Sequence, residues 1–154
     1  DSYDEEIKNI QKMVQQFAAK YEREIPVIVA GGIFDREDVR HCLEDLHADG
    51  VQMATRFVTT KECDAADAYK QAYLNAKKED MERCMNGNPP ELGRCHLCIE
   101  KCDRSKIPYC ITDALVNAVK GNVDDALLFC GSNAYKCNHM ETVKEIIQSL
   151  FKEE

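Results

Sequence analysis

Apolar residues recur at helical spacing at the start of the chain and then give way to a short continuous apolar run. Between residues 3 and 21 they fall on one face of a predicted helix, while lysine and glutamine fill the other. The apolar residues of this face are Ile7, Ile10, Val14, Phe17 and Tyr21. Residues 25–30 are apolar and rich in β-branched side chains without alternation, which is typical of a parallel strand covered on both faces.

A second helix and a second strand follow a Gly31-Gly32 turn. Asp35 can cap this helix with Asp38 in its first turn. Its predicted buried stripe consists of Val39, Cys42, Leu43 and Leu46. Residues 51–54 then predict a short strand, residues 55–57 a loop and residues 64–77 another helix.

This alternation of helix and strand indicates parallel βαβ units, and hence an α/β fold. Two strands do not make a stable sheet domain, and a complete (β/α)8 barrel takes roughly 250 residues. We therefore expect residues 1–80 to be the C-terminal part of a (β/α)8 TIM barrel whose N-terminal half lies in the same or another chain. Residues 81–154, with helices predicted at 111–119 and 141–151, should form a helical, cysteine-rich C-terminal extension.

Two loops at the ends of the predicted strands carry the most informative chemistry. Residues 29–33 read Val-Ala-Gly-Gly-Ile, and residues 50–56 read Gly-Val-Gln-Met-Ala-Thr-Arg. Barrel active sites lie at the carboxyl ends of the strands, where the last two loops often bind a phosphate. Glycine lets backbone N–H groups approach phosphate oxygens, and Thr55 can add a hydroxyl donor. A Gly-Gly pair alone would favour a structural turn, but two such loops one helix apart favour a phosphate site.

These segments resemble the nitronate monooxygenase family, formerly called 2-nitropropane dioxygenases, and the related flavin-type enoyl-ACP reductases. The resemblance rests on residues 25–33 and 50–57 and extends through Glu62-Cys63 and residues 68–70. In the tail, residues 108–111 and 129–135 look like one bacterial branch of the family.

The resemblance implies FMN as the cofactor. Its phosphate would be held by Gly31, Gly32, Ala54 and Thr55, with Ala30, Gln52 and Met53 beside it. The family typically has glycine where this chain has Ala54. It also tends to carry a glycine- and proline-containing loop after Asp80, which this sequence lacks.

No catalytic residue is assigned within this chain. The family's usual acid/base histidine belongs to a Gly-Gly-His segment that would precede residue 1. Among the histidines of this chain, His41 and His47 lie on a predicted helix, and His96 and His139 lie in the tail. None of them can take the place of the family's histidine.

The resemblance implies an FMN-dependent oxidoreductase that oxidises alkyl nitronates with oxygen. The fragment alone is expected to be inactive. One alternative is an enoyl-ACP reductase in which NAD(P)H reduces FMN. Another is a barrel that binds a different phosphorylated ligand. From a different class, a non-catalytic metal-binding or redox-sensing module also remains open.

The metal-binding or redox-sensing alternative depends on the cysteines. Four of the nine fall within sixteen residues and could bind Zn²⁺ or an iron–sulfur cluster, namely Cys95, Cys98, Cys102 and Cys110. Their spacing matches neither the ferredoxin run nor the paired knuckles of most zinc ribbons. A reduced cysteine-rich loop without metal is the competing interpretation.

Charge and composition limit the partners and the cellular compartment that we expect for this protein. The net charge is −8, and no stripe of lysine and arginine suits a nucleic acid, so nucleic-acid binding is not expected. No apolar run is long enough to cross a membrane. An odd number of cysteines without a secretion signal indicates a reducing cytoplasm. The expected partners are a small-molecule substrate and the missing barrel half, and assembly into a homo-oligomer is left open.

Overall fold

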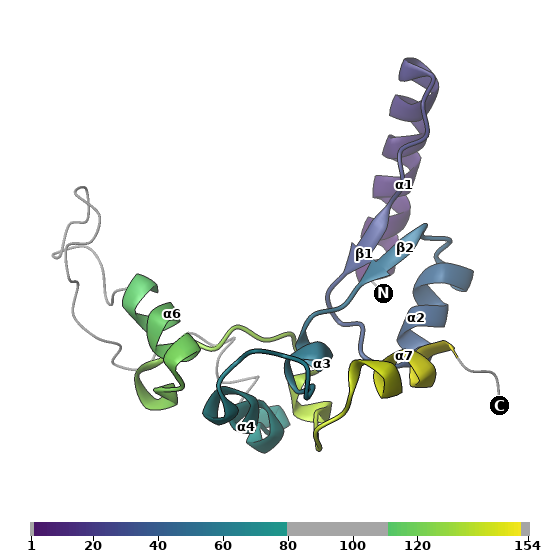
Figure 1. Cartoon of the computed structure of the whole chain (residues 1–154). Helices are drawn as coiled ribbons and strands as arrows, with labels where there is room; N and C mark the ends of the chain where they lie inside the picture. Colours follow the sequence, from purple (N-terminus) through teal and green to yellow (C-terminus); the bar gives the residue numbers. More distant parts are fainter. Residues whose placement is uncertain (1, 80–110, 152–154) are drawn as a thin grey trace, which may run out of the picture. The chain divides into compact units, whose positions relative to one another are not determined.

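The computed structural model of the chain describes residues 2–79 and 111–151 (Figure 1). They belong to two compact units. The first comprises Asp1–Ala54 together with Lys144–Glu154, and the second comprises Thr55–Val143. Each unit is described by itself below.

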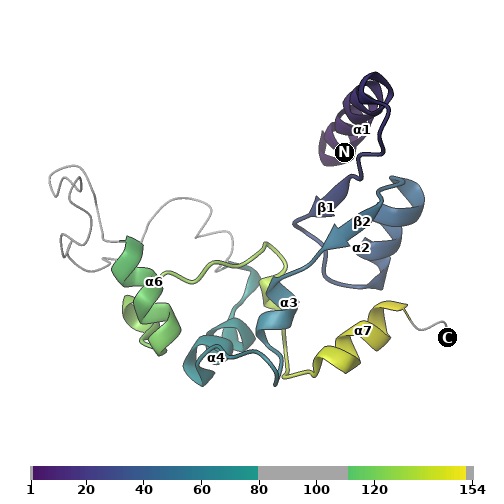
Figure 2. The same ribbon diagram turned by 45° about the horizontal axis from the view of Figure 1, so that its top comes forward.

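The first unit contains the predicted alternation of helix and strand. In chain order it consists of α1 (Ser2–Tyr21), β1 (Ile28–Ala30), α2 (Arg36–Arg40), the π-helix η1 (His41–Asp45), β2 (Gly50–Gln52) and, from Lys144 onward, α7 (Val143–Phe151). The two strands run parallel and side by side, with Ile28 opposite Gly50 and Ala30 opposite Gln52 (Figures 1 and 2). The predicted parallel βαβ unit is therefore confirmed.

The start of α2 follows from its sequence. Asp35 accepts a hydrogen bond from the backbone N–H of Asp38, and the Asp38 carboxylate accepts one from the N–H of Asp35. This reciprocal capping box satisfies two backbone donors that the first turn of a helix leaves unpaired. Of the predicted buried stripe, Val39, Cys42 and Leu46 are buried, whereas Leu43 is only partly buried.

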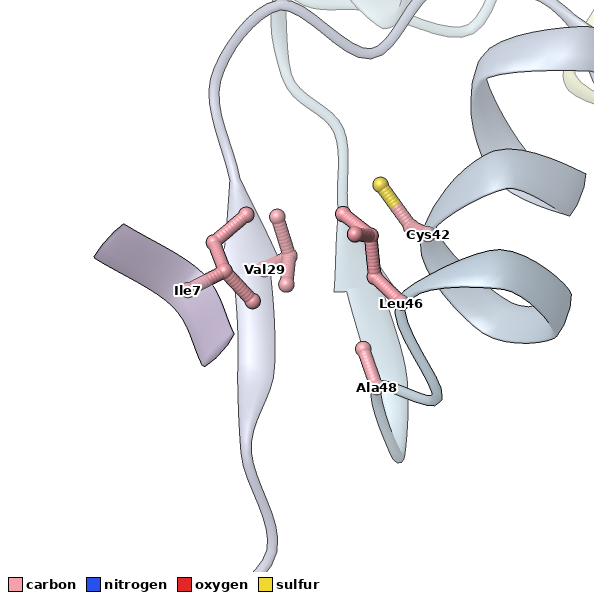
Figure 3. Close-up of a cluster of buried hydrophobic side chains, with 5 residues drawn as sticks. All are labelled: Ile7, Val29, Cys42, Leu46 and Ala48. Atoms are coloured by element: carbon pink, nitrogen blue, oxygen red, sulfur yellow. The ribbon is translucent and has the colours of Figure 1, made fainter. Parts of the chain in front are cut away.

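A single apolar cluster joins α1, the strands and the α2–η1 segment. Its buried members point toward one another in Figure 3, and they are Ile7, Val29, Cys42, Leu46 and Ala48. Val51 of β2 packs against the same cluster. Because strand side chains alternate between faces, Val29 and Val51 face the helices while Ile28 and Ala30 point to the opposite face.

Burial differs from the sequence expectation at three places in this unit. β1 is covered on one face only, since Ile28 is 53% exposed. On α1 the predicted apolar face is mostly exposed, with Ile7 its one buried residue. In α7, Ile146 and Leu150 are buried, whereas Ile147 and Phe151 are exposed. These apolar groups have the right spacing for packing but are not covered by the described residues.

The second unit is largely helical. Its elements are α3 (Thr55–Val58), α4 (Asp67–Asn75), α6 (Ile111–Lys120) and the 3-10 turns η2 (Val123–Asp125) and η3 (Ala134–Lys136). The loop predicted at residues 55–57 is instead the helical turn α3. α4 is shorter than the predicted helix, and it buries Lys70 and Tyr73. The predicted domain boundary at residues 80 and 81 falls outside the described residues and stays a prediction.

Candidate functional site

The carboxyl ends of β1 and β2 bring the two predicted loops to the same edge of the sheet. Ala30 and Gln52 are partners in the parallel register and are the last residues of their strands. Gly31-Gly32 and Met53-Ala54 continue from these two positions. The structure therefore places six of the seven predicted cofactor-binding residues at adjacent strand ends within one unit. Whether they bind a cofactor stays a prediction.

The Gly31-Gly32 turn needs glycine for its backbone conformation. φ is +93° at Gly31 and +72° at Gly32, a region that side chains with a Cβ rarely adopt. A Cβ built at either residue would meet no described atom within 4 Å. Both glycines are exposed, and no described atom fills the space where a Cβ would stand, which fits the close approach of an anion such as a phosphate.

Tyr3 of α1 sets the orientation of this turn, a role that the sequence pattern did not indicate. Its hydroxyl donates to the carbonyl oxygens of Ala30 at 3.1 Å and Gly31 at 3.3 Å. In a trans peptide the C=O and N–H groups point in opposite directions. The contact therefore turns the N–H groups of Gly31 and Gly32 away from α1. Partial burial is the main reason that the pKa of Tyr3 is raised above its ordinary value of 10.0.

Thr55, the remaining predicted cofactor-binding residue, begins the second unit as the first residue of α3. Its Oγ1 accepts a hydrogen bond of 2.8 Å from the backbone N–H of Gly131. A hydroxyl has two acceptor lone pairs and one proton, so this contact leaves the proton as a donor. The predicted role of Thr55 as a phosphate donor is chemically compatible with this arrangement.

The described histidines are placed as helix-side or loop residues. His41 of η1 lies between Asp45 and Asp4, with ring-nitrogen to oxygen distances of 2.9 and 3.2 Å. His47 was expected on the helix but follows η1 with φ at +53°. His96 lies outside the described residues. The assignment of no catalytic residue to this chain stays a prediction.

The candidate metal ligands Cys95, Cys98, Cys102 and Cys110 all lie outside the described residues, so the structure does not bear on that site. In residues 2–79 and 111–151, no group of three or more histidine, cysteine, aspartate or glutamate side chains could hold a metal ion. None of the four cysteines of this part of the chain forms a disulfide bond: Cys42, Cys63, Cys130 and Cys137. Burial raises the pKa of Cys42 and of Cys137. Over the same residues, no helix is both long and apolar enough to span a bilayer.

A parallel βαβ unit with a Gly-Gly turn beside Met53-Ala54 at its carboxyl edge defines an α/β protein with a candidate anion site. The sequence profile of the nitronate monooxygenase family matches residues 2–153. The chain therefore belongs to the nitronate monooxygenase family.

Individual relatives agree with this assignment. A probable nitronate monooxygenase of Staphylococcus saprophyticus is 34% identical over 127 residues, covering 75% of this chain and 35% of the relative. A probable nitronate monooxygenase of Staphylococcus aureus is 43% identical over 56 residues, covering 36% of this chain and 16% of the relative. The chain thus spans about a third or less of these relatives.

Solved structures of FabK from Thermotoga maritima share the fold. A point mutant is 28% identical with a TM-score of 0.58, covering 82% of this chain and 40% of that one. A second FabK structure is 23% identical with the same TM-score, and 43% of its chain is covered. Family and fold likeness together imply that the βαβ unit is part of a TIM-barrel-type fold.

Proposed function

We propose that this chain is the phosphate-binding part of an FMN-dependent oxidoreductase of the nitronate monooxygenase type. The observation that carries the proposal is the pair of glycines at positive φ beside Met53-Ala54, at the carboxyl ends of two paired parallel strands. Membership of the nitronate monooxygenase family supports it. The rest of the barrel, in the same or another chain, completes the enzyme and supplies the acid/base histidine.

In this proposal the backbone N–H groups of Gly31, Gly32 and Ala54 and the hydroxyl of Thr55 hold the phosphate of FMN. Ala30, Gln52 and Met53 lie beside it. The methyl group of Ala54 is compatible with this role because a backbone N–H contact does not involve the side chain. FMN, when bound, supplies the redox chemistry by which an alkyl nitronate is oxidised with oxygen to a carbonyl compound and nitrite.

The test uses the complete barrel with this chain in it. We expect the purified protein to carry FMN, to consume oxygen with an alkyl nitronate and to release nitrite. NAD(P)H oxidation dependent on an enoyl thioester, with no nitrite, would support the reductase alternative instead. Zinc or iron without flavin would contradict the proposal and favour a metal-binding module at the cysteines.

A further inference from the structure

The segment that begins with Thr55 is bound to the distant tail segment 131–141 within the second unit. Thr55 Oγ1 accepts from the Gly131 N–H. One residue later, the Arg56 guanidinium donates to both carboxylate oxygens of Glu141, at 3.0 Å through Nε and 2.8 Å through Nη2. The side chains of this ion pair are only 11% and 14% exposed. A bidentate pair this well shielded from water has a fixed geometry.

The backbone of Glu141 binds the same segment a second time. Its N–H donates to the Thr59 carbonyl at 3.2 Å, and its carbonyl accepts from the Lys61 N–H at 2.9 Å. Thr59, which makes the first contact, and its neighbour Thr60 are each 1% exposed. Glu141 therefore holds residues 56–61 through its side chain and its main chain together.

The Gly131 contact determines where the Thr55 hydroxyl lies. A Cβ on Gly131 would come within 3.1 Å of Thr55 Oγ1, so a side chain there would press on this oxygen. With glycine, the backbone N–H occupies one lone pair of the hydroxyl and leaves the proton as a donor. A donor already held in position loses less conformational entropy when an anion binds.

We propose that residues 131–141 are a positioning element for the cofactor phosphate: Gly131 and the Arg56–Glu141 ion pair hold the Thr55 hydroxyl as a preorganised phosphate donor. This inference rests on the proposed FMN site. It assigns to the tail a role in cofactor affinity, exerted through Thr55 and not by direct contact with substrate.

The experiment compares FMN with riboflavin, which has the same ring system but lacks the phosphate. Dissociation constants for both would be measured by flavin fluorescence in the complete barrel, for wild type, Gly131→Ala and Glu141→Gln. A hydrogen bond to a charged group such as a phosphate contributes more to binding than a hydrogen bond between two neutral groups. Each variant is therefore expected to weaken FMN binding about tenfold and leave riboflavin binding nearly unchanged.

The matched control is Glu62→Gln. Glu62 is exposed and accepts from the Val143 N–H, so it also joins this segment to the tail, but through residues other than Gly131 and Glu141. Its ratio of FMN to riboflavin affinity should match that of wild type. Equal weakening of both ligands in Gly131→Ala and Glu141→Gln would reveal a general structural role and overturn the inference. If Glu141→Gln does not fold, the ratio of FMN to riboflavin affinity in Gly131→Ala alone tests the inference. Failure of wild type to bind FMN would instead overturn the proposed function.

Discussion

At the scale of single residues, Gly31 and Gly32 are the positions where backbone conformation and proposed chemistry coincide. Both have positive φ, and both have open space where a Cβ would stand. A Cβ at either position would therefore meet no described atom within 4 Å. The cost of a substitution comes from the backbone conformation, and in the proposed site also from the space that the phosphate needs.

Gly32→Val in the complete barrel should weaken FMN binding on the order of tenfold to a hundredfold, because a β-branched residue is strained at φ near +72°. Flavin content after gel filtration and the FMN dissociation constant measure the effect. Gly121→Ala is the matched control, since Gly121 also has positive φ, at +81°, but directly follows α6 and is not one of the predicted cofactor-binding residues. That variant should lose stability and keep its flavin. Full flavin occupancy in Gly32→Val would show that the Gly31-Gly32 turn does not bind the phosphate.

At the scale of elements, polar contacts between α1 and the η1 segment supplement the apolar cluster. Gln11 donates to the carbonyls of Leu46 and His47, at 2.7 and 3.1 Å. His41 binds Asp45 on its own helix and Asp4 on α1. Together with Tyr3, these contacts fix α1 against the strand whose end carries the Gly31-Gly32 turn. A change that weakens the packing of α1 should therefore also alter the conformation of the Gly31-Gly32 turn.

The His41 contacts predict a pH dependence. Hydrogen bonds to Asp45 and Asp4 raise the pKa of His41 above its ordinary value of 6.5. The folded state therefore binds this proton more tightly than the unfolded state. The stabilisation is fully present below the unfolded pKa and is lost as pH rises through the higher folded value. The imidazole is exposed to solvent, so salt should reduce the effect.

The measurement is the unfolding free energy of the complete barrel between about pH 6 and about pH 8, the range in which histidine titrates. Wild type should lose more stability across this range than His41→Gln. Glu44→Gln is the control, because it removes an exposed ion pair with Arg40 but no partner of His41. Identical slopes in wild type and His41→Gln would show that the contacts do not stabilise the fold.

At the scale of the whole molecule, the described residues leave much apolar surface uncovered. Ile28 on β1 and Ile10, Met13 and Phe17 on α1 are each about half exposed. The described sheet has two strands, so one edge of each strand has no described partner. A sheet of this size with an open apolar face is not expected to be stable in water.

This chain expressed alone should therefore be insoluble or molten. We expect no cooperative thermal transition and strong binding of a dye that reports exposed apolar surface. Co-expression with the preceding strands and helices of a family barrel should restore a cooperative transition. A monomer of these 154 residues that melts cooperatively would contradict the prediction.

Several features could be predicted from the sequence because they depend on neighbouring residues. Helical periodicity predicted α1 and most of the buried stripe of the α2–η1 segment, and the Asp35–Asp38 spacing predicted the helix start. The Gly31-Gly32 pair predicted a turn that only glycine adopts easily. Parallel pairing followed from the order of elements, because a strand, a helix and another strand connect most readily as a βαβ unit.

The remaining features depended on residues far apart in the chain, and only the tertiary structure decided them. Tyr3 meets Ala30 across 27 positions, and Arg56 meets Glu141 across 85. Periodicity identified the apolar face of α1 but not which of its residues would be covered, because coverage depends on what packs against the helix. It also gave no reason to bury Lys70, whose amine donates to the Thr60 carbonyl. Local sequence thus determined the elements and the turn, while long-range packing determined the partners that hold them, since burial and ion pairing arise only when distant segments meet.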